Sequence, residues 1–213
     1  ADIYLTDDQS VISSHEQTVG GTLLGLKNKI ADIKSNTGNP KNINIDQKNC
    51  GASRTSVLNY LNQINPNVTS FETITDGMLS LCGLSRANYT HTFLNFYSAS
   101  DSDSTLIANK VFRGTVSKGL YVGKGIFFSF ITSVDDWPII LHEMTHSFGA
   151  PDLYTQNNVY GSTYLWGDCQ LMKRDMFDQN TPLCPLENLY WGATTPTVIP
   201  SASTINSGKS VKI

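Results

Sequence analysis

The chain has 213 residues, a length that fits one large domain or two small ones. Hydrophobic residues make up 39% and charged residues 15%, which excludes an intrinsically disordered chain. With 15 basic and 18 acidic side chains the net charge is -3, so the clustered cations that bind nucleic acid or anionic membranes are excluded. No segment approaches the roughly 18 consecutive apolar residues of a membrane span. We expect a monomer without a membrane span.

Cysteine usage and composition indicate an oxidising compartment. The polar residues are mainly Ser, Thr and Asn, and Ala1 at the first position is compatible with a secretory signal that has been removed. The four cysteines contain no CxxC pair, which argues against a zinc knuckle or a redox motif and favours two disulfides. Of the three possible connectivities we favour Cys50 with Cys82 and Cys169 with Cys184, because short-range pairs suit two local loops. These observations predict a secreted protein.

The first part of the chain reads as mixed α and β. Residues 15–34 carry apolar side chains every three or four positions, which predicts an amphipathic helix. Residues 42–46 alternate polar and apolar side chains, as a short strand does, and a second helix is predicted at 54–64.

Three further strands are predicted at 91–97, 110–116 and 125–132. The last of them is apolar on both faces, which is typical of a covered central strand. The neighbouring segment 111–122 is therefore the better candidate for the rim of a cleft.

A helix should follow directly. Asp135 and Asp136 provide N-cap chemistry, Pro138 suits the first turn, and an apolar stripe leads to a stop at Gly149 and Pro151. The stripe consists of Ile140, Met144 and Phe148. Beyond Pro151 the pattern becomes loop-rich, with a possible helix at 186–190 and a tail rich in Pro and Ser, which indicates a smaller C-terminal subdomain.

This helix carries the string HEMTH. His142 and His146 are one helical turn apart, so both imidazoles project from one face and can bind a single ion. Glu143 is rotated by about 100° along the helix, from where it can reach a water on that ion. The pattern therefore predicts a zinc site with Glu143 as general base.

A catalytic zinc needs a third protein ligand, and two carboxylates compete for this place. Gly149 permits a left-handed turn that would return the chain and bring Asp152 to the metal. Glu187, far downstream, is the alternative. We expect Asp152 to be the ligand, and Glu187 would instead indicate a gluzincin-type peptidase.

The extended string HEMTHSFGAPD resembles the zinc motif HExxHxxGxxD of the metzincin metallopeptidases in its Asp form. It is most similar to the immune inhibitor A family, with Pro151, Asp152 and Tyr154 in place, and snapalysin has the same Asp form. Met172, within LWGDCQLM, matches the methionine of the metzincin Met-turn. Cys169, Lys173 and Arg174 depart from the residues usual in that turn.

The resemblance implies an α+β metzincin-like fold with a mixed, mostly parallel sheet and an active-site helix. One catalytic domain would span 1–213, divided by the cleft into an N-terminal subdomain, 1–150, and a C-terminal one, 151–213. It implies a secreted endopeptidase with one Zn²⁺ held by His142, His146 and Asp152, acting on protein or peptide substrates. A downstream tyrosine often assists such chemistry, and four candidates are present: Tyr154, Tyr160, Tyr164 and Tyr190.

Two expectations concern other roles. A secreted binding or adhesion module that retains the metal site without turnover is the alternative to an enzyme, although an intact Glu143 argues against it. Calcium is a weaker possibility at two acidic segments, which lack a full calcium-loop pattern and are better explained as solvated turns. These segments contain Asp101 with Asp103, and Asp175 with Asp178.

Overall fold

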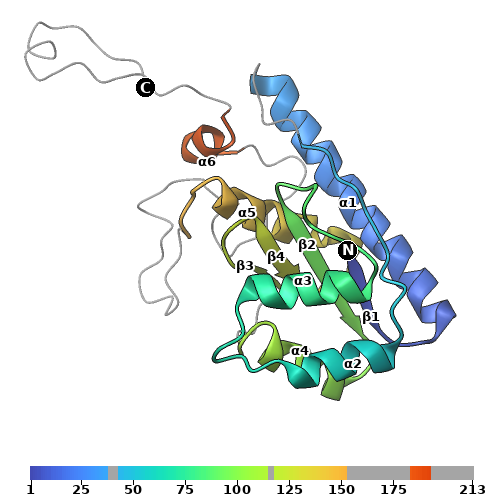
Figure 1. The fold of residues 1–213 in the computed structure, drawn as a ribbon. Coiled ribbons are helices and arrows are strands. Elements are labelled where there is room, and N and C mark those ends of the chain that lie inside the picture. The colour runs from blue at the N-terminus through green and yellow to red at the C-terminus, as the bar shows by residue number, and fades with distance from the viewer. Residues whose placement is uncertain (38–42, 115–117, 153–182, 193–213) are drawn as a thin grey trace, which may run out of the picture.

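The computed structural model describes residues 1–37, 43–114, 118–152 and 183–192 (Figure 1). Strands and helices are mixed along these residues. In chain order they are β1 (Asp2–Leu5), α1 (Gln9–Thr37), α2 (Arg54–Gln63), α3 (Phe71–Leu81), β2 (Thr92–Ser98), α4 (Asp101–Lys110), β3 (Gly119–Tyr121), β4 (Ile126–Ser129), the 3-10 helix η1 (Val134–Asp136), α5 (Trp137–Ser147) and α6 (Pro185–Tyr190). No helix in these ranges has the length and apolar character needed to cross a bilayer.

The four strands form one sheet in the order β1-β2-β4-β3. β1 runs parallel to β2 and β2 parallel to β4, whereas β3 is antiparallel to β4 and lies at the edge. A tight turn joins β3 to β4 through Gly123, Lys124 and Gly125, all with positive φ. The predicted α+β class with a mixed, mostly parallel sheet is confirmed, and so is the central position of the apolar strand.

The two faces of the sheet belong to two hydrophobic cores. Leu94 and Phe96 of β2 point to the same face as Phe128 of β4, and they pack with buried residues of α2, α3 and α4. Phe93 points to the opposite face and packs against a core built from α1, α5 and α6. Since side chains of a strand alternate between faces, the sheet separates these cores and helices cover both sides (Figure 1).

Six predicted elements are confirmed, and two of them are the helix after Asp136, which is α5, and the short helix at 186–190, which corresponds to α6. The helix predicted at 15–34 lies within α1, and the one at 54–64 corresponds to α2. The strand predicted at 91–97 overlaps β2, and the one predicted at 125–132 contains β4. The rim segment 111–122 contains β3, which is indeed an edge strand, although it is much shorter.

Two predicted strands are wrong. Residues 43–46 form no strand, and the alternating pattern arises because Ile43 and Ile45 pack against the core of α1 and α5 without a strand partner. In the segment 110–116, Lys110 instead ends α4 and the next two residues are buried behind that helix. Arg113 follows with a φ of 55°, which is incompatible with a strand.

Some helices and strands were not evident from the sequence pattern. β1, α3 and α4 were not predicted, although Ser70 caps α3 by accepting a hydrogen bond from the Thr73 N–H. At α5 the capping differs from expectation: Asp136 occupies the N-cap position, but its carboxylate accepts from the N–H groups of Thr132 and Ser133 and so caps η1. Pro138 lies in the first turn of α5, as predicted.

The predicted disulfide between Cys50 and Cys82 is present and joins the segment before α2 to the end of α3. Cys184 is also disulfide-bonded. Its predicted partner Cys169 lies outside the described residues, as do Met172 and most of the predicted C-terminal subdomain.

We predict that replacing both Cys50 and Cys82 by Ala lowers the free energy of unfolding by about 3–4 kcal/mol, because the bridge closes a long loop in the unfolded chain. The two cysteines are 32 residues apart. Urea denaturation followed by circular dichroism measures the change. The double variant isolates this bridge, whereas a reductant would also attack the one at Cys184. A loss below about 1 kcal/mol would contradict the prediction.

Candidate metal centre

Three side chains near the end of α5 form the candidate metal site. The Nε2 atoms of His142 and His146 lie 3.1 Å apart. Oδ1 of Asp152 lies 3.2 Å from each of them. In the part of the chain that the structure describes, this is the one group of three His, Cys, Asp or Glu residues close enough to share an ion.

These separations fit a tetrahedral ion. Zinc binds imidazole nitrogen and carboxylate oxygen at about 2.0–2.2 Å, which places two ligand atoms of a tetrahedron roughly 3.3–3.6 Å apart. The observed spacings are within a few tenths of an ångström of this range. The group can therefore hold a metal ion with little rearrangement of the three side chains.

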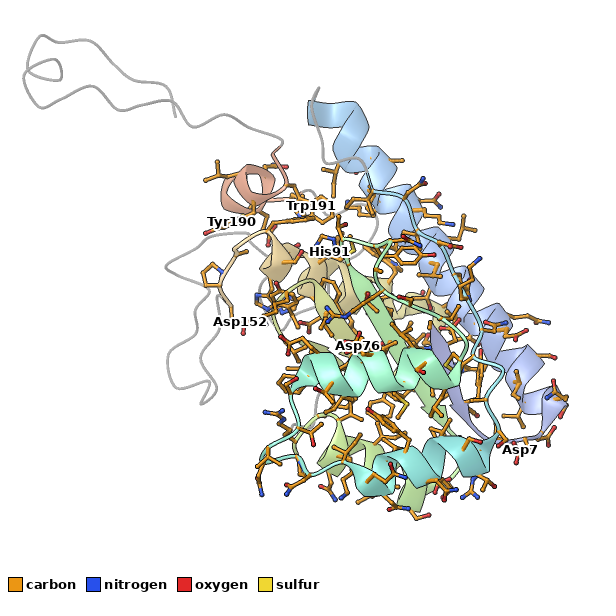
Figure 2. All side chains as sticks on the ribbon, in the orientation of Figure 1. Asp7, Asp76, His91, Asp152, Tyr190 and Trp191 are labelled. Atoms are coloured by element: carbon orange, nitrogen blue, oxygen red, sulfur yellow. A yellow bond between two sulfur atoms is a disulfide. The ribbon has the colours of Figure 1, made fainter. Side chains whose placement is uncertain are left out.

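A turn at Gly149 brings Asp152 to the two histidines. Gly149 has a φ of 100°, a backbone conformation that glycine adopts easily and other residues rarely adopt. Its N–H donates to the carbonyl of His146, and the N–H of Ala150 donates to that of Thr145, which closes the end of the helix. The chain then reverses beside α5, and Asp152 lies next to this end in Figure 2.

The same turn orients one of the imidazoles. Nδ1 of His146 lies 2.8 Å from the carbonyl oxygen of Ala150, so that nitrogen is the donor and carries the proton. Nε2 faces His142 and Asp152 and is therefore the nitrogen that would bind an ion, once its own proton is lost. A second hydrogen bond of this kind is the usual way in which proteins fix a metal-binding histidine.

The charges of the group reinforce each other. Burial opposes ionisation of Asp152, but hydrogen bonds from His142 and His146 outweigh it and hold the pKa of this carboxyl well below its ordinary value. Burial also opposes protonation of His146, yet the hydrogen bonds to Asp152 and Ala150 raise its pKa above the ordinary value. The carboxylate of Asp152 is therefore ionised, and its negative charge stabilises a positive charge next to it. A site that binds a cation needs this property.

Glu143 faces the edge strand rather than solvent. Its side chain is buried, and Oε2 accepts a hydrogen bond of 2.7 Å from the N–H of Tyr121 in β3. Burial raises the pKa of Glu143, against the opposing influence of the two histidines. A Cβ at Gly119 would lie 2.9 Å from Oε1 of Glu143, so the absence of a side chain permits this close approach.

The opposite side of α5 is attached to α6. The indole Nε1 of Trp191 donates to Oγ1 of Thr145 at 2.9 Å, and the ring of Trp191 packs edge-on against Phe148. Both Trp191 and Thr145 are fully buried. Figure 2 places Tyr190 and Trp191 beside the end of α5, so α6 supports the turn that carries Asp152.

The structure brings together the residues that the motif predicted. His142, His146 and Asp152 converge, and Glu143 lies on the same helix. Glu187 lies outside this group, because its buried carboxylate accepts from the N–H of Cys184 and caps α6. The structure therefore favours Asp152 over Glu187 as the third ligand.

The remaining predicted residues divide into two groups. Tyr190 lies beside Gly149, whereas the other site candidates are outside the described residues. Those candidates are Met172, Tyr154, Tyr160, Tyr164, Asp175 and Asp178. The solvated turn expected at the pair Asp101 and Asp103 is wrong, because both lie in the first turn of α4 and the buried Asp103 forms an ion pair with Arg54 at 2.7 Å.

Sequence reasoning missed the contributions of β3 and the support from α6. Gly119 and Tyr121 lie in a strand of three residues that periodicity does not reveal, and only its pairing with β4 brings it to α5. For Trp191 a signal existed, since PLENLYWG reads as a short helix after a proline, but its contact with Thr145 is tertiary.

Comparisons of the chain with models of protein families, with curated proteins and with solved structures find no match. They provide neither a family nor a function. The arrangement of side chains around α5 is therefore the feature that indicates a function.

We predict that Asp152→Ala lowers zinc affinity at least about tenfold, because it removes one of the three ligands. Glu187→Gln should keep one equivalent of zinc, since Glu187 caps a helix instead. Equilibrium dialysis against a competing chelator measures both. Asp135→Ala removes a solvent-exposed carboxylate near the other end of the helix and serves as the matched control. Loss of zinc from Glu187→Gln with retention in Asp152→Ala would reverse the assignment.

Proposed function

We propose that this chain is a zinc-dependent endopeptidase of the metzincin type. The observation that carries the proposal is the convergence of His142, His146 and Asp152 next to a buried Glu143 on the same helix. Each of these four residues stands where HExxHxxGxxD has its ligands and its base. The Gly149 turn, which the motif requires to return the chain, supports the same interpretation.

The donor set favours zinc over the common alternatives. Two imidazole nitrogens and one carboxylate suit a borderline-soft ion, whereas calcium and magnesium prefer oxygen ligands throughout. Three protein ligands also leave a coordination position open, which distinguishes catalytic from structural zinc sites. When bound, zinc supplies Lewis acidity, which polarises a peptide carbonyl and lowers the pKa of a coordinated water to about 7.

Glu143 is suited to transfer the proton. The N–H of Tyr121 holds its Oε2, so the orientation of the carboxylate is fixed before a substrate arrives. Burial raises the pKa of Glu143 toward the working pH, which improves a carboxylate as a proton acceptor. Glu143 would take a proton from the attacking water and deliver it to the nitrogen of the departing amine, and no Ser or Cys nucleophile is needed.

The edge strand offers a surface for an extended peptide. The N–H of Val122 donates to Ile126 and the N–H of Phe130 donates to Lys118, both between the two antiparallel strands. Since backbone groups alternate in direction, those of Gly119 and Tyr121 point away from β4, toward α5. The N–H of Tyr121 is held by Glu143, so a protein or peptide substrate that adds to this edge would use other backbone groups of β3 and would lie alongside Glu143.

Secretion is part of the proposal. The disulfide between Cys50 and Cys82, and the one that involves Cys184, suit a protein that works in an oxidising compartment. A monomeric enzyme is sufficient, because all four site residues come from one chain.

We predict that Glu143→Gln lowers kcat for cleavage of an unfolded protein by about 10²–10⁴-fold, since the amide cannot accept the proton. Its oxygen can still accept the Tyr121 N–H, so folding and zinc content should stay at wild-type values. Digestion of reduced casein, followed by mass spectrometry of the products, measures the rate.

The matched control is Glu16→Gln, which changes the same chemical group on α1. Wild-type protein treated with a chelator should lose activity and regain it when zinc is added. Cleavage by Glu143→Gln at the wild-type rate would exclude the proposed mechanism. Full zinc binding without cleavage by any form would instead favour the inert binding module.

A further inference from the structure

A cavity of about 350 Å³ lies on the side of α5 that faces away from the metal group. Its volume is within the range of ligand pockets, about 300–1,000 Å³. Ile140 and Met144 of α5 line it, and each is two residues from His142, a rotation of about 200° around the helix. None of the four proposed catalytic and metal-binding residues is in its lining.

The walls of this cavity are apolar and come from four elements. Val19, Leu23 and Leu26 of α1 form one wall, and the distance along the helix from the first to the last is about 10 Å. Phe93 of β2 and Phe127 of β4 form the floor beneath α5. The cavity is therefore elongated in the direction of α1 and offers few hydrogen-bond partners to water.

The mouth of the cavity carries charges, but these are already paired. Lys48 forms an ion pair with Asp46 at 3.2 Å, and Arg86 forms one with Asp76 at 2.6 Å. The carboxylate of Asp2 accepts hydrogen bonds from Gln47 and Asn95. The α-ammonium of Ala1 donates to the carbonyl of Phe93, and the carboxylates of Asp2 and Asp46 are near enough to stabilise its charge.

Uncharged polar groups surround these ion pairs at the same mouth. The side chains of Asn44, Ser85 and Asn88 line it and are solvent-exposed. A ligand with a charged head would have to break an existing ion pair or leave its own charge without a partner, and both are unfavourable. A hydroxyl or an amide can instead hydrogen-bond to these amides and to the serine.

We propose that this cavity binds one unbranched aliphatic chain with an uncharged polar head, such as that of a fatty alcohol. The chain lies along α1 between the leucines and the two phenylalanines, and the head lies at the mouth among Asn44, Ser85 and Asn88. The site is independent of the proposed catalytic centre, because no residue is shared between them.

Three probes with the same chain and different heads test this proposal: 1-octanol, octanoate and octylammonium. Isothermal titration calorimetry on the full chain should give one equivalent of octanol bound. Octanoate and octylammonium should bind at least about tenfold more weakly, in line with the cost of an unpaired charge. The same result is expected for Glu143→Gln, so failure of the proposed peptidase activity does not affect this test.

Leu23→Phe should fill part of the cavity and weaken octanol binding at least about tenfold. Leu24→Phe makes the same change one residue along α1, where the side chain is 59% exposed, and should bind octanol as the wild type does. Ile45→Phe repeats the filling from a segment outside the helices, and circular dichroism verifies that each variant is folded.

Each possible outcome decides the proposal. Saturable 1:1 binding of octanol that Leu23→Phe or Ile45→Phe weakens, and Leu24→Phe does not, supports it. Absence of saturable binding overturns it, as does an equal loss in Leu23→Phe and Leu24→Phe. Binding of either charged probe as tightly as octanol overturns the assignment of an uncharged head.

Discussion

The site depends on one local constraint, the left-handed turn at Gly149 that ends α5. This turn returns the chain so that Oδ1 of Asp152 lies 3.2 Å from both imidazoles. It also directs the carbonyl of Ala150 to Nδ1 of His146, which fixes the proton on the nitrogen that faces away from the metal group. If α5 continued beyond Ser147, the carboxylate of Asp152 would lie far from His142 and His146. His146 would also lose its hydrogen bond to the carbonyl of Ala150.

The rest of the fold holds this turn and its helix in place. Trp191, directly after α6, donates to Thr145 on the back of α5, and η1 with its own cap fixes the start of α5. On the front, Gly119 lets β3 approach closely enough for the N–H of Tyr121 to reach Glu143. α5 therefore has separate roles on its different sides, with the candidate metal site and base facing β3 and the apolar cavity facing α1.

The part of this arrangement that sequence predicts is the part encoded locally. The one-turn spacing of His142 and His146, and a glycine followed by Asp152, define the metal group within one short segment, and the structure brings these side chains together. Helices with regular apolar spacing were predicted for the same reason. What the sequence could not provide depends on distant partners. The three residues of β3 form a strand because they pair with β4. The alternating pattern at Ile43 and Ile45 resembles that of a strand, but these side chains pack against helices.

The central claim is that His142, His146 and Asp152 share one divalent cation, and a zinc-soaked crystal measured at the zinc absorption edge tests it most directly. The account predicts one strong anomalous peak, about 2.0–2.2 Å from Nε2 of each histidine and from a carboxylate oxygen of Asp152. A peak elsewhere, or Asp152 turned away from the paired imidazoles at saturating zinc, would contradict it.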